Sequence, residues 1–266
     1  MKLHGIVGEN GAGKSTLMKI LSGVYQKDIG EIYFDGALMQ IKRPIEALHK
    51  GLSIIYQEFN LVNQMNVGEN IYLGRFREIG GLKKIHQKAR LLLDSIGSKI
   101  DTRTPVEDLS VLEKQMVEIC KALSFDSKLI IMDKPSTTLT TTEMERLVTI
   151  IHDLRRRGIT IIYISHKLDE IFELCDRVTV MRNGNIISTK QVGDLTRSTM
   201  IAEMVGRSIE NEYPPRAEHV GDTILEVKGI CTKKLHDISF TAKKGEILSF
   251  IGLVSVDRKS VVWERV

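Results

Sequence analysis

Short apolar runs alternate along the chain with segments in which apolar residues recur every three or four positions. The runs predict buried strands at residues 3–7, 52–56, 129–132 and 159–164. The segment after the first run predicts a helix from Lys14 to about Leu21, with Gly23 as its terminator. This alternation is typical of an α/β fold with a parallel sheet and crossover helices.

Two dipeptides predict tight hairpins. Asp35-Gly36 lies between the segments 31–34 and 37–41, and Asn183-Gly184 lies between 177–181 and 186–189. Residues 68–123, by contrast, have helical periodicity, clearest at 84–96, and no convincing strand. We therefore expect a helical insertion in an α/β core, with a small antiparallel β part.

The character of the chain changes near residue 206. Tyr213-Pro214-Pro215 is flanked by charged residues, which predicts a linker over residues 206–222. Residues 223–227 and 245–252 again predict strands. The segment 245–252 is weakly similar to 3–8, because each runs from apolar residues into a glycine, so a second copy of the first domain is expected to begin here.

Composition argues against a disordered chain, a collagen-like repeat and a disulfide scaffold. Of 266 residues, 42% are hydrophobic and 27% charged, close to the average for soluble globular proteins. The net charge of +4 is too small and too dispersed to indicate a nucleic-acid partner. No apolar run approaches the roughly 18 residues that span a bilayer, so any work at a membrane is expected to be done from its surface, through a partner.

The three cysteines indicate no metal site and no disulfide framework. Cys120, Cys175 and Cys231 are widely separated and odd in number. A reducing cytosol is therefore the expected compartment.

Residues 8–15 satisfy every fixed position of the phosphate-loop pattern G-x-x-x-x-G-K-[ST]. They stand between a predicted strand and a predicted helix, as that mechanism requires. Backbone N–H groups of such a loop close around phosphate oxygens at a helix N-terminus. Lys14 is then expected to reach the terminal phosphates, and Ser15 to ligate Mg²⁺.

Three polar residues follow other predicted strands. Asp133 ends the run 129–132 and is placed to hold the shell of a phosphate-bound Mg²⁺. Gln57 and His166 directly follow their strands, where open α/β sheets present residues to a ligand. Taken singly, each of these two is more often a loop hydrogen-bonder.

Ser110 admits two interpretations. Ser110 and Glu113 form the sequence pattern of a capping box opening a helix through about Leu123. The same helix N-terminus has the dipole to face a phosphate group. From the residues alone the cap is favoured, and the second interpretation stays open.

The order and spacing of the phosphate loop, Gln57, Ser110, Asp133 and Ser165-His166 resemble the ATP-binding subunit of ATP-binding-cassette (ABC) transporters. Residues 8–20, 101–123 and 163–185, with Met204 to Arg207 and Tyr213-Pro214, resemble more narrowly the two-cassette ATPases of bacterial monosaccharide importers of the ribose, galactose and xylose type. The similarity runs from about residue 4 to about residue 254.

The resemblance implies a P-loop NTPase fold, an ABC ATPase cassette with a helical subdomain, and it implies roles for the residues. ATP would be bound by the loop and by the opposing cassette, through Gly8, Asn10, Gly11, Gly13, Lys14, Ser15, Thr16 and Ser110. Mg²⁺ would be held by Ser15, Gln57 and Asp133. Gln57 would also sense the permease, and His166 would contact the γ-phosphate and orient the attacking water.

The implied partners are a transmembrane sugar permease, met near residues 57–75, a sugar-binding protein of the same system, and a second cassette in the intact chain or a partner copy. The implied location is the cytoplasmic face of the bacterial cell membrane, as a peripheral subunit. A soluble, non-transport ABC ATPase is the alternative from another functional class.

The chain departs from the family pattern at three places. Lys134 stands where the family has a catalytic glutamate, and an ammonium cannot act as a general base, which would cost about 10²–10⁴ in rate. An alternative function is thus a cassette that binds ATP and dimerises but hydrolyses poorly, unless Lys134 is a sequence error. Residues 112–114 differ from the family's signature loop, and the family's segment before the first strand, with its adenine-stacking aromatic, is absent.

The resemblance implies a domain organisation for the chain. Residues 1–205 form a first ABC domain lacking its N-terminal strands, 206–222 a linker, and 223–256 the start of a second ABC domain. Residues 257–266 resemble a translated sequencing adapter and are expected to be a non-native tail; a naturally degenerate second loop is the alternative. The intact protein is expected to be about twice as long.

Overall fold

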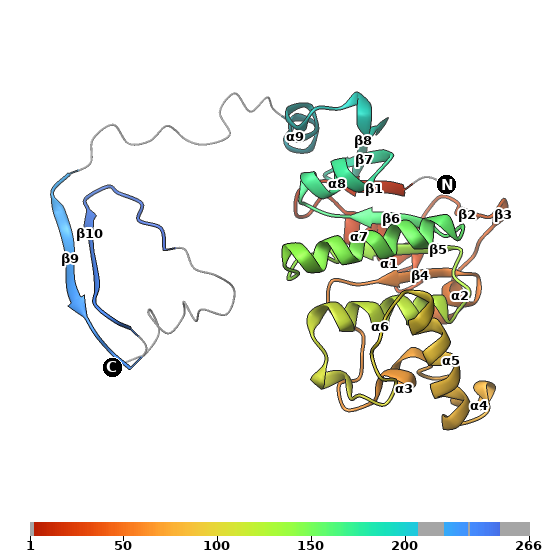
Figure 1. Ribbon diagram of the computed structural model, residues 1–266. Helices are drawn as coiled ribbons and strands as arrows, with labels where there is room; N and C mark the ends of the chain where they lie inside the picture. Colours follow the sequence, from red (N-terminus) through yellow and green to blue (C-terminus); the bar gives the residue numbers. More distant parts are fainter. Residues whose placement is uncertain (1–2, 207–220, 234, 251–266) are drawn as a thin grey trace. The chain divides into compact units, whose positions relative to one another are not determined.

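The computed structural model describes residues 3–206, 221–233 and 235–250. The chain divides into two compact units, Met1–Ile209 and Glu210–Val266 (Figure 1). The predicted linker and tail fall largely on residues 207–220 and 251–266, which lie outside the described residues.

The first unit is built on a six-stranded sheet with the order β4-β5-β6-β1-β7-β8. Its strands are β1 (Leu3–Val7), β4 (Leu52–Ile55), β5 (Leu129–Asp133), β6 (Thr160–Ile164), β7 (Arg177–Arg182) and β8 (Asn185–Gln191). All neighbours pair in parallel except β7 and β8. The predicted parallel sheet is therefore confirmed, and the carboxyl ends of β4, β5, β6, β1 and β7 lie along one edge.

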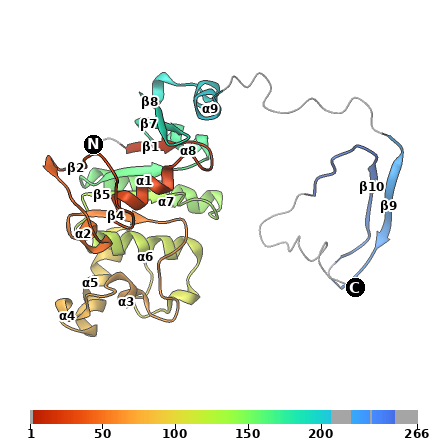
Figure 2. The same ribbon diagram turned by 180° about the vertical axis from the view of Figure 1, so that it is seen from behind.

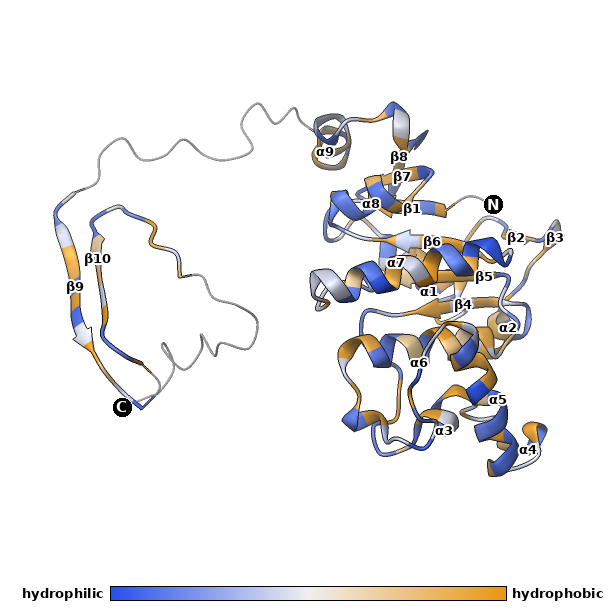
Figure 3. Ribbon diagram, viewed as in Figure 1, coloured by the Kyte–Doolittle hydropathy of each residue, from blue (hydrophilic) through white to orange (hydrophobic). Residues whose placement is uncertain are grey.

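Both faces of the sheet are covered, which explains why its central strands are continuous apolar runs. In β5, Ile130 and Met132 face one apolar cluster, and Ile131 between them faces the other. Helix α7 (Thr141–Arg156) covers the face seen in Figure 1, and α1 (Lys14–Leu21) covers the opposite face seen in Figure 2. In Figure 3 strands β4 and β5 are mainly hydrophobic, whereas hydrophobic and hydrophilic residues alternate along the covering helices.

The insertion between β4 and β5 is helical, as predicted. It consists of α3 (Val67–Ile71), α4 (Phe76–Ile79), α5 (Leu82–Ser95), η1 (Val106–Asp108) and α6 (Val111–Leu123). In α5, Ile85, Ala89 and Leu93 recur every four residues and are fully buried, so this helix packs with one apolar stripe. Pro105 forms an isolated bridge with Asn66, and no strand runs through 68–123 in the described structure.

Both predicted hairpins are present. The first is shorter than expected, with β2 (Tyr33–Phe34) and β3 (Ala37–Leu38). In the second, Asn183 and Gly184 join β7 to β8 with φ angles of 49° and 77°, which are values of a type I′ turn. The remaining elements of the unit are α2 (Pro44–His49), α8 (Leu168–Leu174), η2 (Val192–Asp194) and α9 (Arg197–Val205).

The second unit contains an antiparallel pair, β9 (Thr223–Ile230) and β10 (Ile238–Lys243). The expectation of a strand over 245–252 is wrong for residues 245–250, which have no regular structure; 251 and 252 lie outside the described residues. Ile247 is 94% exposed, so apolar composition here is matched neither by burial nor by strand pairing within the described part of this unit. A strand needs a neighbour for its N–H and C=O groups.

Two further expectations concern the chain as a whole. Cys120, Cys175 and Cys231 are free thiols, in agreement with the absence of a disulfide framework. Within residues 3–206, 221–233 and 235–250, no helix combines the length and apolar character that crossing a membrane requires.

Candidate functional site

The phosphate-loop pattern forms the turn between β1 and α1. Gly8 packs so tightly that a Cβ built on it would lie 2.3 Å from the carbonyl oxygen of Met181 in β7. Gly13 caps α1 with φ 95°, a left-handed conformation that glycine adopts at little cost. Gly184, in the β7–β8 turn, donates its N–H to Ala12 O at 3.1 Å. The hairpin therefore supports the loop from outside.

Lys14 fills the inside of this loop. Its side chain is buried, and Nζ donates to the carbonyl oxygens of Gly8 at 2.8 Å and Glu9 at 2.9 Å. Burial lowers the pKa of Lys14, Lys134 lowers it further, and Asp133 raises it. The cation thus lies within electrostatic reach of Asp133, the last residue of β5, and of Lys134, which follows it.

Asp133 presents an unsatisfied carboxylate oxygen. It is 9% exposed, and its Oδ1 atom is buried without a hydrogen-bond partner among the described residues. Burial raises the pKa of Asp133, and the nearby Lys134 and Lys14 act in the opposite direction. A buried acceptor without a donor is unusual in proteins and indicates a place for a ligand or ion.

Lys134 follows in a left-handed conformation, with φ 48°, while its N–H donates to Ile164 O at 2.8 Å. Such a conformation costs a non-glycine residue roughly 1–2 kcal/mol. The strand pairing of β5 with β6 therefore continues one residue past Asp133. It holds a half-buried ammonium, and no carboxylate, at this position.

The sheet order brings the remaining predicted residues to the same edge. His166 follows β6, the neighbour of β1, and Gln57 follows β4, three strands from β1. Both side chains are exposed, as are Asn10, Ser15 and Thr16. The edge thus joins a loop that can bind phosphate, an acidic group, and polar side chains open to a ligand.

Ser110 lies apart from these residues in sequence and in fold, at the start of α6 in the helical insertion. Glu113 N–H donates to Ser110 Oγ at 3.3 Å, and Ser110 N–H donates to Glu113 Oε2 at 2.9 Å. The capping-box interpretation is confirmed. The interpretation of Ser110 as a phosphate contact stays a prediction, because both hydrogen bonds stay within its own helical turn.

One buried group at this edge was missed by sequence reasoning. Glu170 in α8 accepts hydrogen bonds from Ser136 and Ser165, which lie in the segments that follow β5 and β6. The available signal was an acidic residue four positions after His166. Acidic residues in a first helical turn are too common to single it out.

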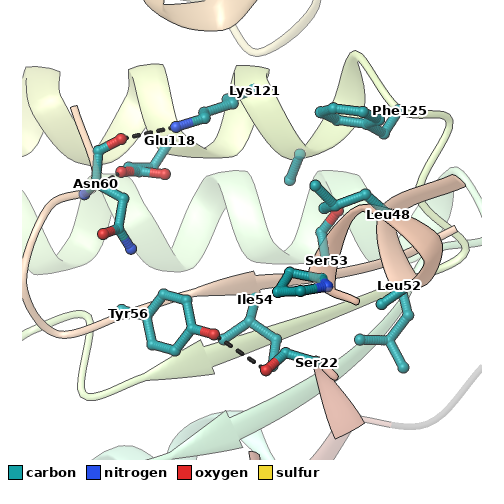
Figure 4. Close-up of a pocket in the computed structure, with 13 residues that line it drawn as sticks. Ser22, Leu48, Leu52, Ser53, Ile54, Tyr56, Asn60, Glu118, Lys121 and Phe125 are labelled. Carbon is teal, nitrogen blue, oxygen red and sulfur yellow. Dashed lines mark hydrogen bonds between the residues drawn. The ribbon is translucent and has the colours of Figure 1, made fainter. Parts of the chain in front are cut away.

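A groove lies between β4, α2 and α6, beside the segment that begins at Gln57 (Figure 4). Its lining includes the buried Leu52 and Ala122 and the half-buried aromatic residues Tyr56 and Phe125. At one end, Glu118 Oε1 accepts from Asn60 N–H at 2.7 Å, and Lys121 Nζ donates to Asn60 O at 2.7 Å. These bonds fix the segment after Gln57 to α6.

A protein-only metal centre is not part of this arrangement. Among the described residues, no group of three or more His, Cys, Asp or Glu side chains could hold a metal ion. Asp133 could share an ion only with other kinds of ligand, such as hydroxyl, amide, water or phosphate oxygens.

The chain is similar to known proteins in sequence and in fold. The galactose/methyl galactoside import ATP-binding proteins MglA of Escherichia coli and of Yersinia pestis are each 44% identical over 266 residues, covering 98% of this chain and 53% of theirs. The chain therefore spans about half the length of these curated relatives.

Solved structures match the fold. A nucleotide-free ATP-binding cassette from an ABC transporter is 26% identical, with a TM-score of 0.64 over 77% of this chain and 84% of that one. A part of the cbiONQ ABC transporter complex from Clostridium perfringens is 24% identical, with a TM-score of 0.64 over 77% and 83%. The expected P-loop cassette fold is confirmed.

The family model described as ABC transporter matches residues 1–137, more than half of the chain. This region contains the phosphate loop, Gln57, Ser110 and Asp133. The chain belongs to the ABC transporter family.

Proposed function

We propose that this chain binds and hydrolyses ATP as the energising subunit of an ABC transporter that imports a sugar. The observation that carries the proposal is the pairing of a phosphate loop, closed on Lys14, with a buried Asp133 whose Oδ1 has no partner among the described residues. Loop N–H groups and Lys14 would bind the phosphates. Similarity to galactose/methyl galactoside importers supports a monosaccharide as cargo.

Mg²⁺ is the cofactor that the site fits. The unpartnered Oδ1 of Asp133 and the exposed Ser15 and Gln57 offer the hard oxygen ligands that this ion prefers. When bound, Mg²⁺ would neutralise charge on the phosphates during phosphoryl transfer. Asp133 would hold the ion through its water shell, and Ser15 and Gln57 would complete the set.

His166 is proposed to contact the γ-phosphate and orient water, because it follows β6 beside the phosphate loop. Lys14 would reach the terminal phosphates from the loop. Asn10, Gly11, Gly13 and Thr16 would supply contacts from the loop and first helical turn. Ser110, at an exposed helix N-terminus, is proposed to meet the nucleotide held by a second cassette.

The proposed organisation is a first cassette at 1–205, a linker at 206–222, the start of a second cassette at 223–256 and a non-native tail at 257–266. The second cassette would come from the intact chain or a partner copy. The pairing of β9 with β10 supports a separate folding unit after the linker.

The groove between β4, α2 and α6 is proposed to receive a transmembrane sugar permease. Its apolar and aromatic lining suits an amphipathic segment, and the hydrogen bonds from Glu118 and Lys121 to Asn60 connect it to the segment after Gln57. Nucleotide contacts at Gln57 could thus reach the permease. The subunit would lie peripherally at the cytoplasmic face of the membrane, supplied by a sugar-binding protein of the same system.

A second candidate function is supported by Lys134. Its ammonium lies near Lys14 and Asp133, where a general base would be needed. The alternative is a cassette that binds MgATP and dimerises but turns over slowly.

Two measurements test these functions. Phosphate release at saturating MgATP separates a hydrolysing subunit from a binding module. Co-purification of the chain with a galactose-type permease separates an importer subunit from a soluble, non-transport ATPase. Tyr56→Ala should reduce permease capture, whereas Tyr33→Ala, at an exposed site away from the groove, should not; equal capture of both would contradict the groove assignment.

A further inference from the structure

A buried carboxylate joins two segments at the candidate site. Glu170 is 7% exposed, on helix α8, four residues after His166. Its Oε2 accepts from Ser165 Oγ at 2.8 Å and from Tyr163 OH at 2.9 Å. Its Oε1 accepts from Ser136 Oγ at 2.5 Å. All three hydroxyl donors are buried.

The two oxygen atoms of this carboxylate accept hydrogen bonds from the segments that follow two different strands. Ser165 directly precedes His166, in the segment after β6. Ser136 lies two residues after Lys134, in the segment after β5. A single side chain therefore links the backbone that follows Asp133 to the backbone that presents His166.

Lys167 closes the same network. Its Nζ donates to Ser136 O at 3.2 Å and lies 3.3 Å from Glu170 Oε1. Its backbone N–H donates to Ser165 Oγ at 3.0 Å. The residues on both sides of His166 are thus bonded into the network, while the His166 side chain stays exposed.

Stability alone is a weak reason for such a group. Replacing a buried ionic cluster with apolar residues of similar volume is often neutral or stabilising. Fully satisfied polar networks do, however, fix one geometry, since each hydrogen bond has a direction. A bridge between two loops at the edge of a ligand site is a place where fixed geometry matters.

We propose that Glu170 is a positioning residue, which holds the segment after Asp133 and the segment containing His166 in one fixed arrangement at the γ-phosphate end of the site. This inference rests on the proposed ATP-binding function. Glu170 would touch no substrate; it would act through Ser136 and Ser165.

Glu170 is expected to affect the binding of ATP and of ADP differently. Both nucleotides would use the phosphate loop, but only the γ-phosphate would use the two bridged segments. Loosening the bridge should weaken ATP binding by about tenfold, the scale of a charge-assisted hydrogen bond, and leave ADP binding unchanged. General loss of folding would instead weaken both nucleotides together.

The test measures dissociation constants of ATP and ADP, with Mg²⁺, for the full chain and for Glu170→Gln. Glu173→Gln, at an exposed position of the same helix, is the matched control. Ser136→Ala and Ser165→Ala each remove one donor and serve if Glu170→Gln does not fold. Hydrogen exchange of the nucleotide-free chain reports the two segments without any turnover.

The expected result is a ratio of ATP to ADP affinity reduced about tenfold in Glu170→Gln, with faster exchange in both segments and no change in Glu173→Gln. An unchanged ratio, a parallel loss of both affinities, or faster exchange in only one segment would overturn the positioning role. A parent chain that binds neither nucleotide would overturn the proposed function itself, which is a distinct outcome.

Discussion

Gly8 and Met181 are so close that no side chain fits between them: a Cβ on Gly8 would lie 2.3 Å from the Met181 carbonyl oxygen. Real Cβ atoms do not approach other atoms this closely. The packing of the phosphate loop against β7 therefore requires glycine at position 8. The loop's shape is therefore set partly by a strand more than 170 residues away in sequence.

Gly8→Ala should destabilise the fold by about 1–3 kcal/mol, because the obstructing atom belongs to backbone and cannot rotate away. Urea unfolding measures the change. Gly193→Ala is the control, since a Cβ there meets nothing within 4 Å. Equal stability of the two variants would show that the loop does not depend on this contact.

Asp133→Asn should have opposite effects on stability and on Mg²⁺ dependence. Burial raises the pKa of Asp133, so at neutral pH folding places an unfavourable charge in the core. The neutral amide should unfold at a slightly higher temperature without ligand, yet lose the Mg²⁺-dependent gain in ATP affinity. Asp28→Asn, on the surface, should change neither; retention of full Mg²⁺ dependence would remove Asp133 from the site.

Lys134→Glu should raise the rate of ATP hydrolysis by about 10²–10⁴, because it supplies a general base where an ammonium stands. Steady-state phosphate release measures it. Lys134→Gln controls for loss of the positive charge and should give a much smaller gain. A parent chain with a high rate that Lys134→Glu does not improve would contradict the view that Lys134 impairs turnover.

Glu170 should make stability depend on acid pH. Burial raises its pKa, but hydrogen bonds from Ser136, Ser165 and Tyr163 and the charge of Lys167 together hold it below the usual 4.5. The contribution of Glu170 to the free energy of unfolding is therefore fully present above about pH 4.5. It is lost as the pH falls through the lowered pKa that Glu170 has in the folded chain.

The measurement is the free energy of unfolding of the parent chain and Glu170→Gln between pH 7 and pH 3. The difference should be about 1.5–3 kcal/mol at pH 7 and should shrink below pH 4.5. A difference that stays constant over this range would mean that the carboxylate is not the stabilising species.

Local sequence patterns predicted most helices and strands of the first unit, because these elements depend mainly on residues that are neighbours in sequence. The buried β5 run, the Asn183-Gly184 turn and the Ser110 capping box are each set by neighbouring residues, and each has its predicted form. The strand expected at 245–250 failed because strand formation depends on a partner elsewhere, which apolar composition does not specify.

Site residues could be predicted only where a sequence motif or the end of a predicted strand marks them. Lys14 and Asp133 follow from the phosphate loop and a strand ending in a carboxylate. The bridge through Glu170 depends on three-dimensional contacts with Ser136, 34 positions away, and no local pattern encodes such a contact. The support of the loop by Met181 was hidden for the same reason.

Equilibrium binding of MgATP to this chain shows whether the edge that carries Lys14 and Asp133 is a nucleotide site. We expect saturable binding that Lys14→Met weakens at least about tenfold, because the variant removes the charged donor and keeps the buried stem. Lys19→Ala, on the same helix, should bind like the parent. Absence of binding, or equal affinity of the parent and Lys14→Met, would contradict the assignment of this edge as a nucleotide site.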